Sequence, residues 1–258
     1  MDIAVCVKQI PSADAPVDLD PNTFLLRREG EPVLDDSDTH GIEMALRLAE
    51  ASGGEVTLIS MVADGASAGL RSALAMGAAR AVVVSDPALS GSDALGTAKV
   101  IAAVVRRLGV GLLITATESS DGYTGTLPVQ VAELLDWPAL TYVTEAGTEG
   151  GTLQVRRQTD LGTDEVRCEP PAVLSVTAGA VEPRYPSLRG IMAARQKPID
   201  QLTLADLGIE PSTVGAAGAR QEVLSLAVAP LPSAGEVVID EGEGHEAILA
   251  ALTRWKVI

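Results

Sequence analysis

Aromatic residues are almost missing from this chain: Phe, Trp and Tyr together make up 2% of its 258 residues. Hydrophobic residues of all kinds nevertheless make up 47%, so a core must be built from Val, Leu, Ile and Ala. That composition is typical of helices packed on a parallel β-sheet, whose buried strands are rich in aliphatic residues. The length allows one large domain, or a domain with a substantial extension.

Cysteine and positive charge are scarce too. Cys6 and Cys168 lie far apart and outside any CxxC or Cys/His spacing, which argues against a disulfide framework or a zinc site and favours a reducing, cytoplasmic location. With 19 Lys and Arg against 35 Asp and Glu, the formal net charge is −16. Because nucleic-acid binding needs a basic face, we expect no nucleic-acid partner.

Long hydrophobic runs and targeting signals are lacking as well. The N-terminal stretch MDIAVCVKQIP is apolar over too short a length for a signal peptide and has no basic start. No window approaches the roughly 20 apolar residues of a membrane-spanning helix. The sequence therefore predicts a soluble protein without membrane insertion.

The first half of the chain alternates apolar runs with segments of helical period. The predicted strands cover residues 3–7, 56–61, 81–84 and 110–116, and the predicted helices cover 38–52, 67–76, 91–108 and 126–135. This order predicts right-handed crossovers and an α/β fold with a doubly wound, mostly parallel sheet.

The pattern changes after Trp137-Pro138. Short strand-like runs follow at 140–144, 153–157, 164–168 and 172–176, separated by Gly-rich turns, and they predict β-hairpins added to one edge of the sheet. Beyond them we predict a C-terminal arm that ends in a helix at roughly 243–255. We divide the chain accordingly into an α/β domain, residues 1–180, and an arm, residues 181–258.

The loop after the fourth predicted strand is the richest candidate for a ligand site. It reads ATESSDGYTGT at 116–126, where Gly122 and Gly125 permit close backbone approach and Thr124 and Thr126 offer hydroxyls. In an open parallel sheet, ligands collect beyond the carboxyl ends of the strands. The pattern predicts a phosphate cradle for a mononucleotide, with a plain surface turn as the alternative. It lacks the Gly-Lys-Ser/Thr ending of a P-loop and the GxGxxG spacing.

No residue pattern indicates bond-making catalysis. His40 and His245 lack a nearby Ser or Cys in a catalytic motif, and we interpret both as surface histidines. The acidic stretch 240–244 lacks the ligand spacing of a calcium loop, so no metal site is predicted. Lys8 has two open interpretations, a phosphate contact or a surface lysine.

The segment EPRYPSLRGIMAAR, at 182–195, combines a Pro-stiffened turn with apolar and basic residues. It could be an amphipathic helix packed on its own domain. It could equally be a protruding anchor for a protein partner, with Leu188 as its apolar tip. The residues alone do not choose between these interpretations.

Several stretches together resemble the β subunit of electron transfer flavoproteins, particularly the bacterial members. They are VCVKQIP, LRSALAMGAARAVVV, ATESSDGYTGTLPVQVAELLDWP and PPAVLSVTAGAVEPRYPSLRGIMAARQKPI, at 5–11, 70–84, 116–138 and 170–199. The resemblance covers nearly the whole chain and implies a fold of the adenine-nucleotide-binding type. It also implies an electron carrier without catalytic residues of its own.

The partners and cofactors that the resemblance implies are those of a heterodimer. An α subunit would hold the redox FAD at the interface, with the C-terminal arm of this chain wrapped around it. Electrons would come from flavin dehydrogenases, such as the acyl-CoA dehydrogenases of fatty acid oxidation, and pass to a membrane quinone reductase. An AMP without a redox role would lie in this chain.

Two sets of site residues follow from the resemblance. The AMP pocket would be formed by Cys6, Asp38, Met61, Ala116, Asp121, Gly122, Tyr123, Thr124, Gly125 and Thr126. The recognition loop that docks the dehydrogenase would present Tyr185, Leu188, Ile191 and Met192, with Leu188 as its tip.

The chain departs from the family pattern at three places. Asp35-Asp36-Ser37 replaces an Asn-Pro-Phe-like turn, Ala13 stands where some members have an aromatic residue near the flavin, and QTDLGTD at 158–164 alters the family signature. Two alternatives remain beside the one-flavin carrier. One is an electron-bifurcating subunit with a second FAD in the AMP site, and the other is a nucleotide-binding regulator similar to universal stress proteins.

Overall fold

The computed structural model describes residues 1–12, 19–28, 30–227, 235 and 237–258. Ala13 therefore lies outside the described residues, as do parts of the predicted arm. The chain divides into two compact units, Met1–Val223 and Leu224–Ile258. Residues 181–223, which the sequence groups with the arm, belong to the first unit.

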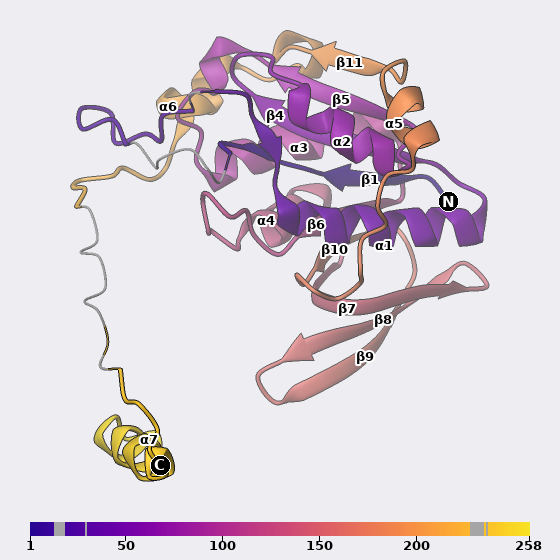
Figure 1. The fold of residues 1–258 in the computed structure, drawn as a ribbon. Helices are drawn as coiled ribbons and strands as arrows, with labels where there is room; N and C mark the ends of the chain where they lie inside the picture. The colour runs from indigo at the N-terminus through magenta and orange to yellow at the C-terminus, as the bar shows by residue number, and fades with distance from the viewer. Residues whose placement is uncertain (13–18, 29, 228–234, 236) are drawn as a thin grey trace. The chain divides into compact units, whose positions relative to one another are not determined.

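A nine-stranded sheet in the described part of the chain organises the first unit, in the order β11-β5-β4-β1-β6-β10-β7-β8-β9 (Figure 1). Its strands are β1 Ile3–Cys6, β4 Val56–Val62, β5 Arg80–Ser85, β6 Leu112–Ala116, β7 Ala139–Glu149, β8 Thr152–Thr159, β9 Gly162–Cys168, β10 Ala172–Val176 and β11 Ile199–Leu202. All neighbours from β11 to β7 are parallel, and β7, β8 and β9 are antiparallel. The predicted doubly wound, mostly parallel α/β fold is confirmed.

Helices cover both faces of this sheet. The longer ones are α1 Asp36–Ser52, α2 Ala68–Met76, α3 Ala94–Leu108 and α4 Leu127–Leu135, and the shorter ones are α5 Leu188–Ala194, α6 Gly215–Gly218 and the 3₁₀ turns η1 Pro87–Leu89, η2 Ala205–Leu207 and η3 Pro211–Thr213. A separate antiparallel pair joins β2 Gln9–Ile10 to β3 Val33–Leu34. Among the described helices, none is both long and apolar enough to cross a membrane.

The core has two layers because side chains alternate along each strand. Ile3 and Val5 of β1 pack with α1 and α2 on one face, while Ala4 between them packs with α3 and α4 on the other. In β6, Leu112 and Ile114 face the first layer and Leu113 faces the second. Strands buried on both faces explain why the apolar runs are continuous.

Two strands differ from the sequence-based prediction. Residues 172–176 do not belong to an edge hairpin: β10 runs parallel between β6 and β7, inside the sheet. Every residue of β10 is buried, which is the mark of a central parallel strand. Residues 199–202, which we assigned no strand, form β11 and pair in parallel with β5 at the opposite edge. The hairpins β7–β8 and β8–β9 at the other edge are confirmed.

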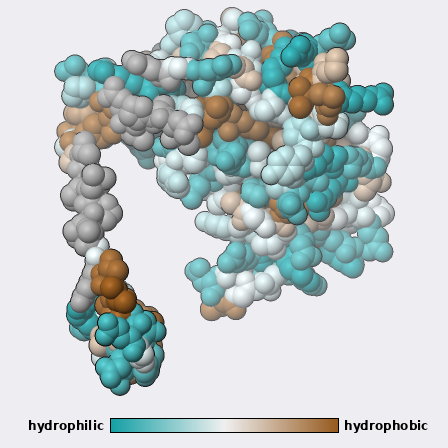
Figure 2. All heavy atoms as spheres, in the orientation of Figure 1, coloured by the Kyte–Doolittle hydropathy of each residue, from teal (hydrophilic) through white to brown (hydrophobic). Residues whose placement is uncertain are grey.

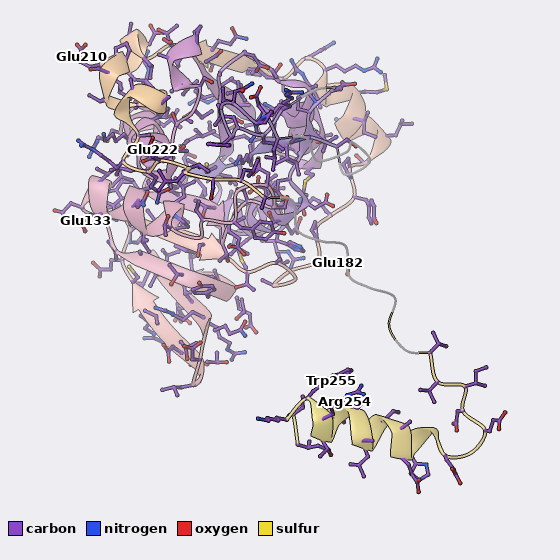
Figure 3. All side chains as sticks on the ribbon, turned by 90° about the vertical axis from the view of Figure 1, so that its left-hand side faces the viewer. Glu133, Glu182, Glu210, Glu222, Arg254 and Trp255 are labelled. Carbon is purple, nitrogen blue, oxygen red and sulfur yellow. The ribbon has the colours of Figure 1, made fainter. Side chains whose placement is uncertain are left out.

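The second unit contains α7, Gly244–Arg254, which confirms the helix expected near 243–255. Arg254 places its guanidinium 5.7 Å from the ring centre of Trp255 at the end of this helix (Figure 3). None of the residues of α7 is buried, and Ile248 and Leu249 expose more than half of their surface. Within the described part of this unit, nothing covers the apolar side chains of α7.

The burial of β10 gives a first testable prediction. Leu174→Ala should lower the free energy of unfolding by about 2–5 kcal/mol, because it leaves a cavity in a fully buried layer. Leu161→Ala, at a hairpin tip that is 100% exposed, should change it by less than about 0.5 kcal/mol. Urea unfolding followed by circular dichroism measures both. Equal effects of the two variants would contradict the central placement of β10.

Candidate functional site

A cavity of about 530 Å³ opens beyond the carboxyl ends of β1, β4 and β6. β1 pairs with β4 on one side and with β6 on the other, so the order of strands reverses at β1. This is the switch point at which open α/β sheets bind ligands. Its volume lies within the range of small-molecule sites.

Most residues predicted for the nucleotide pocket meet at this cavity. Its walls include Cys6, Asp38, Met61, Ala116, Gly122, Thr124 and Gly125. Asp121 and Thr126 do not line it, although Asp121 bonds to two cations that do. Tyr123 points instead to a neighbouring cavity. Residues of the loop after β6 therefore line two cavities.

Asp121 forms ion pairs with two basic side chains of the cavity wall. Lys8 places its Nζ 2.6 Å from one carboxylate oxygen of Asp121, and Arg28 places a guanidinium nitrogen 2.5 Å from the other. Burial alone would raise the pKa of Asp121, but the charges and hydrogen bonds of Lys8 and Arg28 hold that pKa below its usual value. Lys8 thus lines the cavity with its ammonium group paired to Asp121, and its contact with a phosphate stays a prediction.

Two further carboxyl groups join the start of α1 to this region. Asp35, the N-cap of α1, accepts hydrogen bonds from the backbone N–H and the hydroxyl of Ser120, at 2.7 and 2.9 Å. Asp38 accepts one from the backbone N–H of Lys8 at 2.6 Å. Burial raises the pKa of Asp38 well above its usual range. These bonds fix the loop after β6 and the turn after β1 to the same helix end.

Cys6 lies at the cavity with its thiol removed from solvent. Removal from solvent raises the pKa of its thiol to about 12, so the thiolate is scarce at neutral pH. Among the described residues, no group of three or more His, Cys, Asp or Glu side chains could hold a metal ion. The arrangement suits binding of a ligand by shape, backbone and a few polar groups.

The neighbouring cavity, of about 790 Å³, lies between the loop after β6 and the β7–β8 hairpin. Tyr123 and Tyr142 line it, and their backbone φ angles of 48° and 57° are strained for residues with a side chain. Thr177 Oγ1 and Arg157 Nε are buried there without a hydrogen-bond partner in the described chain. Such groups call for an explanation by a further contact.

Sequence reasoning missed this second cavity. Its walls come from the loop after β6, from β7 and β8 and from the end of β10, and no short motif connects them. It also missed residues of the first cavity, among them Arg28 and Asp93. Asp93 caps α3 by accepting from the backbone N–H of Gly96 at 2.7 Å, and the preceding Gly91-Ser92 turn was the signal that could have identified it.

The segment expected to bind a protein partner is both packed and exposed. α5 lies so close to α2 that a Cβ on Gly190 would come within 2.6 Å of the Ala75 carbonyl oxygen, and Ala194 is buried. Tyr185, Leu188, Ile191 and Met192 are nevertheless exposed, Leu188 by 77%. In Figure 2 the brown, hydrophobic spheres at the place of α5 stand out from a largely hydrophilic surface. The segment therefore packs on its own domain through Gly190 and Ala194, and its docking of a protein partner stays a prediction.

His40 is a correction to the surface-histidine interpretation. It is half-buried in α1, and its Nδ1 lies 2.7 Å from the carbonyl oxygen of Val181. It contacts the chain just before the α5 segment, whereas His245 lies in the second unit, outside any buried environment.

The fold and the main cavity define a class of protein: a doubly wound α/β domain with a ligand cavity at its switch point. Residues 23–207 match the model of the electron transfer flavoprotein domain. The chain is 38% identical to an electron transfer flavoprotein subunit beta of Mycobacterium tuberculosis, over 99% of both chains. It is 35% identical to one of Thermoanaerobacterium thermosaccharolyticum, over 92% of both.

A further relative is a subunit of the caffeyl-CoA reductase-Etf complex of Acetobacterium woodii, 33% identical over 92% of both chains. The chain belongs to the electron transfer flavoprotein family, among the β subunits.

The lowered pKa of Asp121 predicts a pH dependence of stability. Its carboxylate stabilises the fold above the ordinary value of 3.8, and this contribution is lost as the pH falls through the lower pKa of the folded state. Between about pH 7 and pH 3, the wild type should lose about 1 kcal/mol more of its free energy of unfolding than Asp121→Asn.

Urea unfolding across that pH range measures this difference. Asp164→Asn, which changes an exposed carboxylate of β9, is the matched control and should keep the wild-type pH dependence. An Asp121→Asn variant that loses as much stability on acidification as the wild type would refute the assignment.

Proposed function

We propose that this chain is the β subunit of a heterodimeric electron transfer flavoprotein that works in the cytoplasm and has no catalytic residues of its own. Its α subunit would hold FAD, whose ring accepts and releases the electrons. Flavin dehydrogenases, including acyl-CoA dehydrogenases of fatty acid oxidation, would reduce the heterodimer, and a membrane quinone reductase would oxidise it. The observation that carries this proposal is the exposed apolar face of α5 on a domain with a nucleotide-sized cavity.

The residues around the main cavity fit an AMP. Gly125 has a φ of 61°, and its bare backbone lets a phosphate approach the loop ahead of α4, where unpaired N–H groups favour an anion. Thr124 adds a hydroxyl, and Lys8 and Arg28 lie on the same wall. In this arrangement the AMP holds the loop and three strand ends together and takes no part in electron transfer.

The second cavity fits a role at the interface with the flavin-holding subunit. Tyr123 and Tyr142 offer aromatic faces, and Arg157 and Thr177 bring buried polar atoms that still lack partners in the described chain. The apolar side chains of α7, Ile248 and Leu249, are further surface for the α subunit to cover. The arm would in this way wrap around its partner.

The nucleotide content of the heterodimer tests the first part of the proposal. After co-expression with the α subunit, acid release and chromatography should give FAD and AMP in equal amounts. Gly125→Val should lower the AMP about tenfold or more, because the side chain fills the cradle and strains a left-handed backbone. Gly151→Val, at another left-handed turn away from both cavities, should leave AMP unchanged.

A second FAD in place of AMP would overturn this assignment. It would group the chain with electron-bifurcating flavoproteins, the alternative that the resemblance leaves open. A chain that stays without an α subunit and carries only AMP or ATP would favour the regulator alternative.

The docking part of the proposal is tested at Leu188. Leu188→Ala should slow reduction of the heterodimer by an acyl-CoA dehydrogenase about tenfold or more, since it removes the central apolar anchor. AMP and FAD content should stay at the wild-type level. Val129→Ala, on the exposed side of α4, is the control and should reduce normally. Wild-type rates for Leu188→Ala would exclude α5 as the docking site.

A further inference from the structure

The α5 segment is attached to α1 by a set of charged contacts at its N-terminal end. Arg184 places its Nε 2.7 Å from one carboxylate oxygen of Glu43 and a terminal nitrogen 2.5 Å from Glu50. The backbone N–H of Arg184 also donates to Glu43, at 3.2 Å. One guanidinium thus bridges two carboxylates that are two turns apart on α1.

Glu43 is the buried centre of these contacts. Its side chain is 3% exposed, and Arg47 donates to it at 2.7 Å beside Arg184. Burial would raise the pKa of Glu43, but the hydrogen bonds from Arg184 and Arg47 lower it below its usual value. The carboxylate is therefore charged at neutral pH, and a buried charge is stable only while its partners stay in place.

A second set of contacts holds the other end of the segment to α2. Arg71 donates to the carbonyl oxygens of Ala194 and Lys197, at 2.6 and 2.8 Å. The Nζ of Lys197 in turn donates hydrogen bonds to the carbonyl oxygens of Leu74 and Ala78 at the end of α2, at 2.9 and 2.6 Å. The Leu74 carbonyl also accepts the capping N–H of Gly77, so Lys197 adds to the C-terminal cap of α2.

Between these two attachments the segment is held by the Ser187 cap, by the close approach of Gly190 to α2 and by the buried Ala194. α5 has 7 residues, which is too short to be stable as an isolated helix. Its large apolar side chains point to solvent, so they contribute little burial to its own folding. The charged contacts at its N-terminal end, which begin two residues after Glu182 (Figure 3), therefore add to a small set of packing contacts.

We propose that Arg184 is a positioning residue: through Glu43 and Glu50 it holds the segment from Tyr185 to Met192 in its docking conformation before a dehydrogenase arrives. This inference rests on the proposed docking function of α5. Arg184 itself lies against α1, just ahead of the exposed apolar residues in the sequence. Its loss lowers the fraction of molecules that are ready to bind, and apparent affinity falls by that fraction.

This mechanism predicts a separation of KM from kcat. In the heterodimer with Arg184→Gln, backbone amides of residues 185–194 should exchange with deuterium about tenfold faster or more. The KM for the acyl-CoA dehydrogenase should rise about threefold to tenfold, while kcat at saturating dehydrogenase stays within about twofold, because the bound complex is unchanged.

Two further variants keep the test decisive. Glu50→Gln removes the exposed half of the bridge without stranding a buried charge, so it should shift exchange and KM in the same direction by a smaller factor, even if Arg184→Gln folds poorly. Arg80→Gln breaks a surface ion pair with Asp200, at the β5–β11 edge, and should change neither quantity.

The possible results separate this inference from the docking function. Wild-type exchange in Arg184→Gln and Glu50→Gln would overturn the positioning role, and so would faster exchange with an unchanged KM, provided that Leu188→Ala still impairs reduction. If Leu188→Ala also leaves reduction unchanged, the docking function itself fails, and the positioning role fails with it.

Discussion

The parallel pairing of β1 with strands on both sides is the constraint on which the rest of the molecule depends. β4 and β6 lie in register against Ile3 on its two edges, so the chain must leave β1 in one direction and later return on the other side. Right-handed crossovers then force α1 and α2 onto one face and α3 and α4 onto the opposite one. The loops diverge where this winding reverses, and the main cavity occupies the space between them.

α1 connects the main cavity to the segment ahead of α5. Its first turn carries Asp35 and Asp38, which fix the turn after β1 and the loop after β6. Its later turns carry Glu43 and Glu50, which bind Arg184 ahead of α5. A helix buried along much of its length is a rigid element, so α1 joins the loops at the cavity and the chain ahead of α5 to one stiff support.

The sequence predicted what depends on local pattern. Continuous apolar runs identified the parallel strands, and the glycines and hydroxyls of 116–126 identified the loop at the cavity. It did not predict β10 as a central strand, because an apolar run of five residues reads the same at an edge or in the middle of a sheet.

The sequence also did not predict contacts between distant parts of the chain. The pairing of Arg184 with Glu43 joins residues 141 positions apart, and the second cavity combines β7, β8 and the loop after β6. Such contacts follow from topology, which a single sequence does not reveal residue by residue. The same holds for β11, which is short, half-polar and defined mainly by the strand beside it.

The exposed apolar side chains of α7 have a consequence for the stability of the chain against proteolysis. A helix without a single buried residue, carrying Ile248, Leu249 and the neighbouring Trp255 in water, is open to proteases and to unspecific association. If a partner protein covers these side chains, it shields them from both, so copies of the chain without that partner are the more vulnerable ones.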